Sequence, residues 1–400
     1  MNDGHHAWIG AAEASQLLGV SRTTLYAYVS RGFVRSQASP GSTRERTYSR
    51  DDVERLRRRT EERREPDKAA ARALQWGMPI LESSIALIDG RRLFYRGQDV
   101  ATLARSRSLE DVAALIWTGQ FETARATSIT HLAPAKASGP FITRAQTMLA
   151  AAAARDPLAF DLRPASVALA GGRILRLLTR AATASDPGGS TVDGALARHW
   201  RVGAAGAEIV RAALVLSADH ELNVSSFTAR CVASAGSHPY AVVIAGLAAL
   251  EGPKHGGASA RAESMLDSLS RRGRSLHAAV GDRLRRGESI DGFGHPLYHD
   301  GDPRARLLLD LLAERYPKSA DQRFVKEFAH AATGATGEHP NIDFGLAAVA
   351  RVLKLTHGAP LMLFAIGRSV GWIGHAIEQY ATGQLIRPRA KYVGVPPATG

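Results

Sequence analysis

The sequence is short of cysteine, because Cys231 is the only one in 400 residues. A single cysteine excludes an intrachain disulfide and a zinc site built from several cysteines. This absence favours a protein that works in a reducing compartment, and the cytoplasm is the expected location.

The sequence also lacks the signals of export and membrane insertion. Its start, MNDGHHAWIG, has no basic segment followed by an apolar one. No run of about 18 apolar residues occurs, so no membrane partner is expected. The phosphate-binding pattern GxxxxGK[ST] and the zinc pattern HExxH are absent as well, and no metal is expected.

Aromatic residues make up only 6% of the chain, whereas hydrophobic residues make up 45%. The windows SLEDVAALIWTG, RAQTMLAAAAA and DPRARLLLDLLAERY place apolar residues at helical spacing. Strand-like alternation is found mainly in SSIALIDGRRLFYRG, residues 83–97. The pattern predicts an all-α globular protein.

The formal net charge of +13 suits anionic partners, such as nucleic acid, a CoA-like nucleotide or polycarboxylates. Residues 1–66 contain 12 arginines and no lysine against 9 acidic residues, a net charge of only +3. Most of the positive charge therefore lies elsewhere, and DNA binding by the first residues would not explain it.

Residues 11–34, AAEASQLLGVSRTTLYAYVSRGFV, have apolar residues at helical spacing on both sides of a short break. Ser21 is predicted to cap the second helix, and Gly32 to end it in a left-handed conformation. A Pro-Gly turn, a short basic strand-like piece and a helix capped at Ser49 or Asp51 follow.

This arrangement resembles the winged helix-turn-helix of MerR-like and excisionase-type regulators. The resemblance implies that the second helix faces the major groove of DNA and that the wing contacts phosphates. The implied DNA-binding residues are Arg22, Thr23, Thr24 and Tyr28 on the helix and Arg44 and Arg46 on the wing. The alternative is a module that serves only protein packing or dimer contacts, and that could gate activity without DNA.

We expect residues 1–65 to form the winged module and residues 66–75, rich in arginine, glutamate and alanine, to form an exposed linker helix. A second domain is expected from Trp76 onward.

Three segments combine a histidine with turn residues: ADHELNVSSFTAR (218–230), EGPKHGGA (251–258) and GFGHPLYHDGDPRARL (292–307). Two more stand out, EHPNIDFGLAAV (338–349) and a basic stretch at 366–394. Each histidine alone is explained as well by a surface or turn position. A zinc site made from them has no supporting ligand spacing.

Together and in this order, the five segments resemble citrate synthase. The similarity begins with residues 83–97 and SLEDVAALIWTGQF, weakens over 121–200 and is dense over 218–394. It implies an all-helical homodimer or higher homo-oligomer, with a large domain (76–256 and 356–400) and an inserted small domain (257–355). The implied reaction joins acetyl-CoA or propionyl-CoA to oxaloacetate and hydrolyses the thioester, without any cofactor.

The resemblance also implies a role for each matched residue. Asp343 would remove a proton from the carbon next to the thioester, His255 would donate to the thioester carbonyl, and His295 would polarise the ketone. The oxo acid would be bound by His220, Arg304, Arg368 and Arg387, with Arg387 reaching across the dimer interface. Gly256 and Gly257 would make room for the thioester beside the backbone.

Two positions depart from the family pattern. HGGAS ends in Ser259 where HGGAN is commoner, and Pro296 stands where many members have arginine. CoA-contacting residues are not carried over, since their positions vary within the family. A second function remains open, a DNA-binding transcriptional regulator whose citrate-synthase-like domain senses an oxo acid or acyl-CoA.

Overall fold

The computed structural model describes residues 8–39, 45–54, 56–57, 81–121, 129, 132, 137–270 and 275–396. The chain divides into two units, Met1–Glu82 and Ser83–Gly400. The predicted linker helix at 66–75 and the wing residue Arg44 lie outside the described residues.

The first unit is a small winged module. Its helices are α1 (Ala11–Leu18) and α2 (Arg22–Ser30), and its strands are β1 (Trp8–Gly10), β2 (Ser36–Ala38) and β3 (Arg46–Ser49). The strands form an antiparallel sheet in the order β1-β3-β2. Its core consists of Ile9, Ala14, Leu25, Val34, Tyr48 and Val53.

The local signals of this module are confirmed. The Ser21 side chain accepts a hydrogen bond from the Thr24 amide and caps α2. Gly32, with φ +75°, follows the last turn of that helix. A further helical stretch, 50–54, begins directly after Ser49. The chain therefore turns where small and polar residues allow it.

The second unit begins with a small antiparallel sheet made of β4 (Ala86–Asp89), β5 (Arg92–Tyr95) and β6 (Gln98–Asp99). The turn between β4 and β5 has Gly90 at φ +57°, as a two-residue hairpin loop requires. The strand-like alternation predicted for 83–97 is confirmed.

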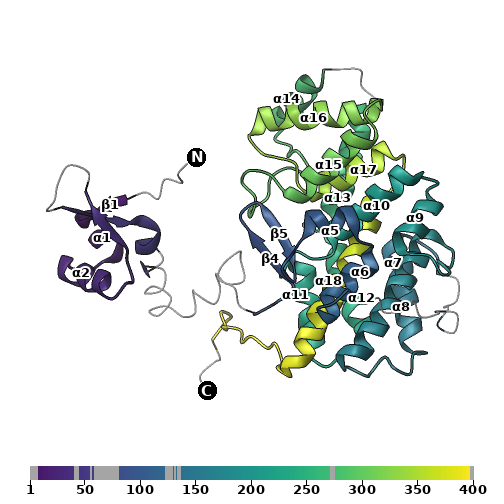
Figure 1. The fold of residues 1–400 in the computed structure, drawn as a ribbon, viewed down its shortest axis with the longest axis horizontal. Helices are drawn as coiled ribbons and strands as arrows, with labels where there is room; N and C mark the ends of the chain where they lie inside the picture. The colour runs from purple at the N-terminus through teal and green to yellow at the C-terminus, as the bar shows by residue number, and fades with distance from the viewer. Residues whose placement is uncertain are drawn as a thin grey trace. The chain divides into compact units, whose positions relative to one another are not determined.

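Helices make up the rest of this unit, as Figure 1 shows. They are α5 (Val100–Ser106), α6 (Leu109–Thr118), α7 (Phe141–Ala153), α8 (Pro164–Thr183), α9 (Val192–His199), α10 (Ala204–Ser217), α11 (Val224–Ser234), α12 (Pro239–Leu250), α13 (Gly257–Ser270), α14 (Leu276–Arg285), α15 (Pro303–Arg315), α16 (Ala320–Thr336), α17 (Ile342–Val352) and α18 (Ala359–Thr382). The predicted mainly helical fold is confirmed. In Figure 1, α13 to α17 gather at one end of this unit.

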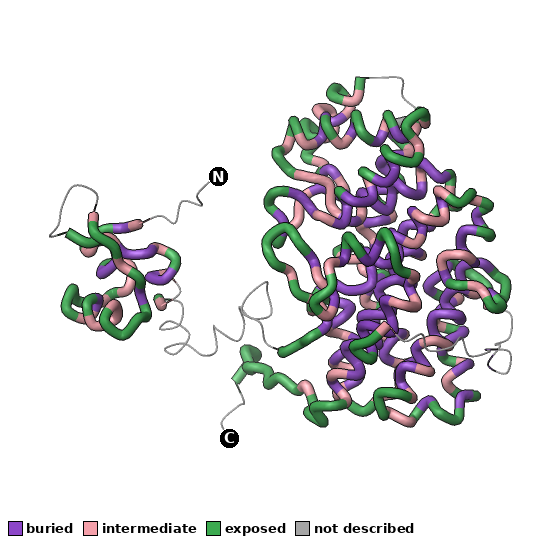
Figure 2. The backbone as a smooth tube through the Cα atoms, viewed as in Figure 1, coloured by how far each residue is buried: buried purple, intermediate pink, exposed green. Residues whose placement is uncertain are grey.

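Helix α18 runs through the middle of this unit and packs against α10, α11 and α12. Figure 2 shows buried residues concentrated along the central helices and exposed ones on the outer turns. Among the described residues, no helix combines the length and the apolar character needed to cross a membrane.

The contact between α18 and α10 is made by backbone atoms. A Cβ atom on Gly367 would lie 2.4 Å from the carbonyl oxygen of Leu214, and one on Gly371 would lie 2.5 Å from that of Ala218. The Gly371 amide donates a hydrogen bond to the Ala218 oxygen at 2.9 Å. Glycine is required at both positions because any side chain would force the helices apart.

Candidate active site

His220 follows the end of α10 and is buried. Its Nε2 lies 2.9 Å from the hydroxyl of Tyr298, and its ring centroid lies 5.2 Å from that of His295. Burial and the positive charges of Arg304 and Arg368 lower the pKa of His220 well below its usual value. The ring is therefore neutral at neutral pH.

His295 lies in the loop before α15 and is held in one tautomer. Its Nδ1 accepts a hydrogen bond from the Leu297 amide at 3.1 Å, so the neutral ring carries its proton on Nε2. Burial, and then the charge of Arg304, lower the pKa of His295 to about 4. The ring is thus a neutral hydrogen-bond donor at Nε2.

Arg304 lies in the first turn of α15 and is buried together with Asp302. Its Nε and Nη2 donate to the two oxygens of the Asp302 carboxylate at 3.0 and 2.7 Å. The same carboxylate accepts the Ile342 amide at 3.0 Å, at the start of α17. Asp302 therefore fixes the guanidinium and joins the two helices.

Arg368 on α18 is also buried, but its guanidinium is only partly satisfied. Nε donates to the carbonyl oxygen of Ser217 at 2.7 Å. Nη1 and Nη2 have no hydrogen-bond partner among the residues that the structure describes. Buried guanidinium groups without partners are costly, and a planar anion such as a carboxylate would satisfy both nitrogens.

The loop that carries His295 is fastened to the start of α17. The Asn341 amide donates to the Gly292 oxygen at 2.8 Å, and its side-chain amide donates to the Gly294 oxygen at 3.0 Å. Gly292, at φ +84°, lies so close to Phe344 that a Cβ atom would be 2.9 Å from the Phe344 nitrogen. His295 and Asp343 are therefore held in a fixed relation.

Asp343 lies in the first turn of α17 and is partly buried. Its Oδ1 accepts a hydrogen bond from the hydroxyl of Ser259 on α13. Burial raises the pKa of Asp343, while the hydrogen bond from Ser259 opposes the rise. A carboxylate with a raised pKa is a better base than a solvated one.

His255 lies in the turn between α12 and α13. Its Nε2 is 2.8 Å from the Ser225 hydroxyl oxygen, which also accepts the Trp372 indole N–H at 3.1 Å. The single Ser225 proton goes either to His255 or to Asn223 Oδ1, which is 2.8 Å away. When it goes to His255, the neutral ring carries its own proton on Nδ1 and can donate it to a ligand.

The charge of His255 is set by its surroundings. Burial, and then the positive charge of Arg368, lower the pKa of His255 to about 4. Its ring also contacts the edge of Phe364, with centroids 5.8 Å apart. His255 is therefore neutral and held between two helices.

The interpretation of Gly256 needs correction. A Cβ atom there would lie 2.4 Å from the carbonyl oxygen of Leu250, the last residue of α12. The close contact inside the protein by itself requires a glycine at this position. Gly257 is less constrained, since a Cβ there would lie 3.3 Å from the Gly252 oxygen.

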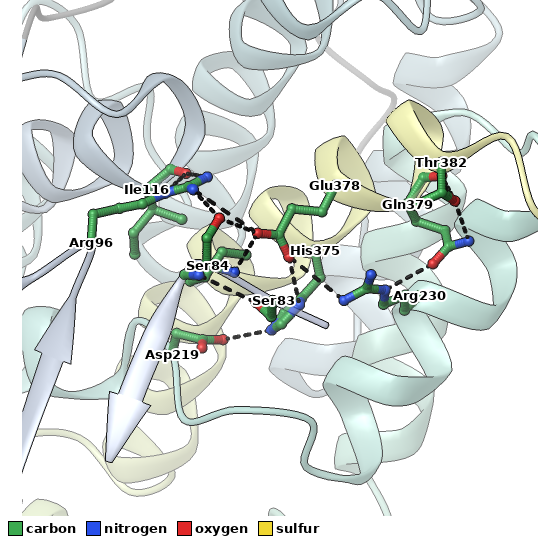
Figure 3. A network of polar contacts seen from close by, with 11 residues as sticks. Ser83, Ser84, Arg96, Ile116, Asp219, Arg230, His375, Glu378, Gln379 and Thr382 are labelled. Atoms are coloured by element: carbon green, nitrogen blue, oxygen red, sulfur yellow. Dashed lines mark hydrogen bonds and ion pairs between the residues drawn. The ribbon is translucent and has the colours of Figure 1, made fainter. Parts of the chain in front are cut away.

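A partly buried polar network includes Asp219, the residue before His220 in the chain, as Figure 3 shows. His375 on α18 has Nε2 3.2 Å from Asp219 Oδ1 and Nδ1 3.9 Å from Glu378 Oε2. Glu378 also lies 3.6 Å from Arg230 and accepts both the amide and the hydroxyl of Ser84 at 2.8 Å. Burial lowers the pKa of Arg368, and the negative charge of Asp219 partly opposes that effect.

Six of the seven matched residues come together in the second unit. Burial, and then the charges of other residues in this set, lower the pKa of His220, His255, His295 and Arg368. Arg387 is exposed in the segment after α18, which leaves the helical body in Figure 1. Its exposure contrasts with the burial of the other two matched arginines, Arg304 and Arg368.

In the winged module, Arg22, Thr23 and Arg46 are exposed. Thr24 is half-buried, and Tyr28 packs against the core of the module. Tyr26 on the same helix is 52% exposed and was not singled out from the sequence.

Several residues of the site could not be assigned a role from the sequence. They are Ser225, Ser259, Tyr298, Asp302 and Trp372. All lie within or beside the quoted segments, and only Ser259 carried a signal, its departure from the commoner pattern. Within the described ranges, no group of three or more His, Cys, Asp or Glu side chains could hold a metal ion.

The buried histidines predict a pH dependence of stability. The pKa of His220, His255 and His295 is lowered from 6.5 in the folded protein. Below about pH 6.5 the unfolded chain binds protons that the folded chain does not, so the free energy of unfolding decreases as pH falls. We expect a lower melting temperature at pH 5 than at pH 7, measured calorimetrically without ligands.

Two variants separate these histidines from other acid-sensitive groups. His220→Gln should make the melting temperature less dependent on pH between 5 and 7. His277→Gln is the matched control, because His277 is exposed on α14. A pH dependence that is equal in all three proteins would contradict the assignment.

The chain matches two families of known proteins. The family described as the C-terminal domain of citrate synthase matches residues 73–389, and the MerR helix-turn-helix regulatory family matches residues 11–60. Citrate synthase 2 of Bacillus subtilis is 37% identical over 192 residues, which cover 47% of this chain and 51% of the relative. The 2-methylcitrate synthase of Shewanella oneidensis is 31% identical over 194 residues, 48% of this chain and 51% of the relative.

The chain thus spans about half the length of the curated relatives that it matches. Similarity to solved structures extends further. Citrate synthase from Thermotoga maritima has a TM-score of 0.66 at 26% identity, covering 81% of this chain and 96% of that one. Citrate synthase from Thermoplasma acidophilum, solved as a ternary complex with carboxymethyl coenzyme A and oxaloacetate, has a TM-score of 0.69 at 24% identity, covering 82% and 97%.

Proposed function

Since the chain belongs to the citrate synthase family, we propose that it condenses an acyl-CoA with oxaloacetate and hydrolyses the thioester. The product is citrate from acetyl-CoA or 2-methylcitrate from propionyl-CoA. The observation that carries the proposal is the buried Arg368 guanidinium, whose Nη1 and Nη2 have no partner in the described part of the chain. His220 and His255, which its charge affects, are both neutral because their pKa values are lowered. Such a pocket suits an anion that also has a carbonyl group.

Oxaloacetate supplies both of these groups. One carboxylate would accept from Nη1 and Nη2 of Arg368 in a bidentate pair. The other would lie near Arg304, which Asp302 already holds in one orientation. His220 would complete the binding site through its imidazole ring, which the contact between Nε2 and the Tyr298 hydroxyl orients.

The first chemical step makes a nucleophile from the acyl-CoA. Asp343 takes a proton from the carbon next to the thioester carbonyl, and the electron pair of the broken C–H bond moves onto the carbonyl oxygen. His255 donates a hydrogen bond to that oxygen as negative charge develops there. A neutral donor suits this step, and the lowered pKa keeps His255 neutral.

The second step forms the carbon–carbon bond. The enolate carbon attacks the ketone carbon of oxaloacetate, and the thioester C=O bond re-forms. His295 passes its Nε2 proton to the ketone oxygen, which becomes a hydroxyl group. Its tautomer is already fixed by the bond from the Leu297 amide to Nδ1. Water then cleaves the thioester, which releases the carboxylic acid and the free thiol of CoA.

The proposal includes an assembly and a domain division. We propose a homodimer in which Arg387 of each subunit completes the other subunit's site, since Arg387 is exposed whereas Arg304 and Arg368 are buried. The large domain would comprise 76–256 and 356–400, and the small domain 257–355. His255 and Asp343 would then lie at the boundary between them.

Thiol release tests the function. The intact protein should release CoA thiol from acetyl-CoA or propionyl-CoA only when oxaloacetate is present. The ratio of kcat/KM for the two thioesters reports acyl preference, which one methyl group changes by about 10- to 200-fold. No thiol release by folded protein whose dimeric state has been measured would refute the proposal.

A second candidate function is DNA binding by the N-terminal module, which the MerR family match at 11–60 favours. Arg22 and Thr23 are exposed at the start of α2, as a helix that reads the major groove requires. The regulator hypothesis adds that oxo acid or acyl-CoA bound in the second unit alters this binding. Gating of the enzyme without DNA is the competing role for the module.

A gel shift with the DNA upstream of the gene measures this function. The intact protein should bind in a salt-dependent manner, and Arg22→Ala should weaken binding roughly tenfold. Arg163→Ala is the control, because it removes an 82% exposed cation of the second unit. Binding that persists after deletion of residues 1–65 would contradict the assignment.

A further inference from the structure

We propose that Ser259 is a positioning residue for Asp343, because its hydroxyl holds one carboxylate oxygen and leaves the other to take the substrate proton. The inference rests on the proposed condensation. It assigns a role to the position at which this chain departs from the commoner HGGAN pattern.

The contact joins two helices that pack against each other, α13 and α17. Ser259 is fully buried in the first turn of α13, and its Oγ donates to Asp343 Oδ1. Its own amide donates to the Gly256 oxygen at 3.2 Å, which fixes the backbone at this point. The hydroxyl therefore has a defined direction toward the base.

The other end of the contact is equally fixed. The Asp343 amide donates to Asn341 Oδ1 at 3.0 Å, and Asn341 caps α17. With the backbone held and Oδ1 occupied by Ser259, rotation of the carboxylate is restricted. Oδ2 is then the oxygen that faces the proton to be removed, and holding a base in this way is worth a large factor in rate.

The hydrogen bond also tunes the base. Burial raises the pKa of Asp343 and the bond from Ser259 lowers it, so removal of the hydroxyl would raise the pKa further. Ser259 thus keeps the carboxylate ionised at a pH where burial alone would favour its protonated form.

Ser259 links the base to the second catalytic group as well. It follows His255 by four residues, in the same turn and first helical turn. The backbone between them is tightened by the bond from the Ala258 amide to the His255 oxygen at 2.9 Å. The donor to the thioester and the partner of the base are therefore carried by one rigid segment.

The test compares pH profiles of thiol release. Ser259→Ala should move the acidic limb of kcat/KM up by about one pH unit, a roughly tenfold change in proton affinity, and lower kcat about tenfold. Ser259→Cys keeps a weak donor of similar shape and should give an intermediate shift. Ser264→Ala, an exposed serine on the same helix, should leave the profile unchanged.

A purely structural role predicts something different. In that case Ser259→Ala lowers kcat but leaves the acidic limb in place, and this result would overturn the inference. If the wild-type protein releases no thiol, the proposed function fails while Ser259 remains testable. The infrared C=O band of protonated Asp343, identified by its loss in Asp343→Asn, should then titrate at higher pH in Ser259→Ala, and an unchanged titration overturns the inference.

Discussion

Asp343→Asn is expected to lower kcat for thiol release roughly a thousandfold, with little change in the KM for oxaloacetate. The amide cannot accept the proton from the acyl-CoA, yet it has nearly the same size and still accepts the Ser259 hydrogen bond. Steady-state kinetics with oxaloacetate varied at saturating acyl-CoA measures both constants.

The stability of this variant separates chemistry from folding. Because burial disfavours the Asp343 carboxylate, the neutral amide should leave the melting temperature equal or higher. Asp310→Asn, at an exposed position on α15, is the matched control and should retain full activity. A folded Asp343→Asn protein with more than about a tenth of wild-type kcat would remove Asp343 from the role of base.

His255→Ala is expected to lower kcat by about 100- to 1000-fold, since the thioester oxygen loses its hydrogen-bond donor as charge develops. The KM for oxaloacetate should change less than about twofold, because the oxo acid is held by other groups. His277→Ala, an exposed histidine on α14, is the control.

A variant of Ser225 tests the same role of His255 in a second way. Ser225→Ala removes the hydroxyl between His255 and Trp372 and should lower kcat by a smaller factor, about tenfold, because the ring keeps its nitrogen but loses its orientation. If Ser225→Ala and His255→Ala each have wild-type kcat, the donor to the thioester must be another group.

Much of the fold follows from local signals in the sequence. Ser21 caps a helix and Gly32 follows its end, and the alternation before and after Gly90 forms a hairpin. These features depend on residues within a few positions of each other, where backbone preferences decide the structure. Helical spacing likewise predicted helices in SLEDVAALIWTG, RAQTMLAAAAA and DPRARLLLDLLAERY, where the structure has α6, α7 and α15.

The site was predicted unevenly. Family motifs supplied His255, His295 and Asp343 by name, but their hydrogen-bond partners depend on contacts between distant segments. Trp372 reaches Ser225 across 147 positions, and no periodicity connects them.

Gly256 is a second case in which the sequence did not predict the contact that the residue makes. The sequence suggested space for a ligand, whereas the structure places the carbonyl oxygen of Leu250 where a side chain would be. A glycine in the sequence indicates a close contact, but only the folded structure shows which atoms make it.

Arg368 and His255 differ in how freely their surroundings can change during evolution, because Arg368 lies beside the backbone contact of α18 with α10. Arg368 follows Gly367 directly, and a side chain in place of Gly367 would collide with the backbone of α10. The proposed recognition of a carboxylate at Arg368 should therefore persist among close descendants of this protein. His255 lies in a turn instead, so a new preference for a longer or shorter acyl group is expected to arise from substitutions around that turn.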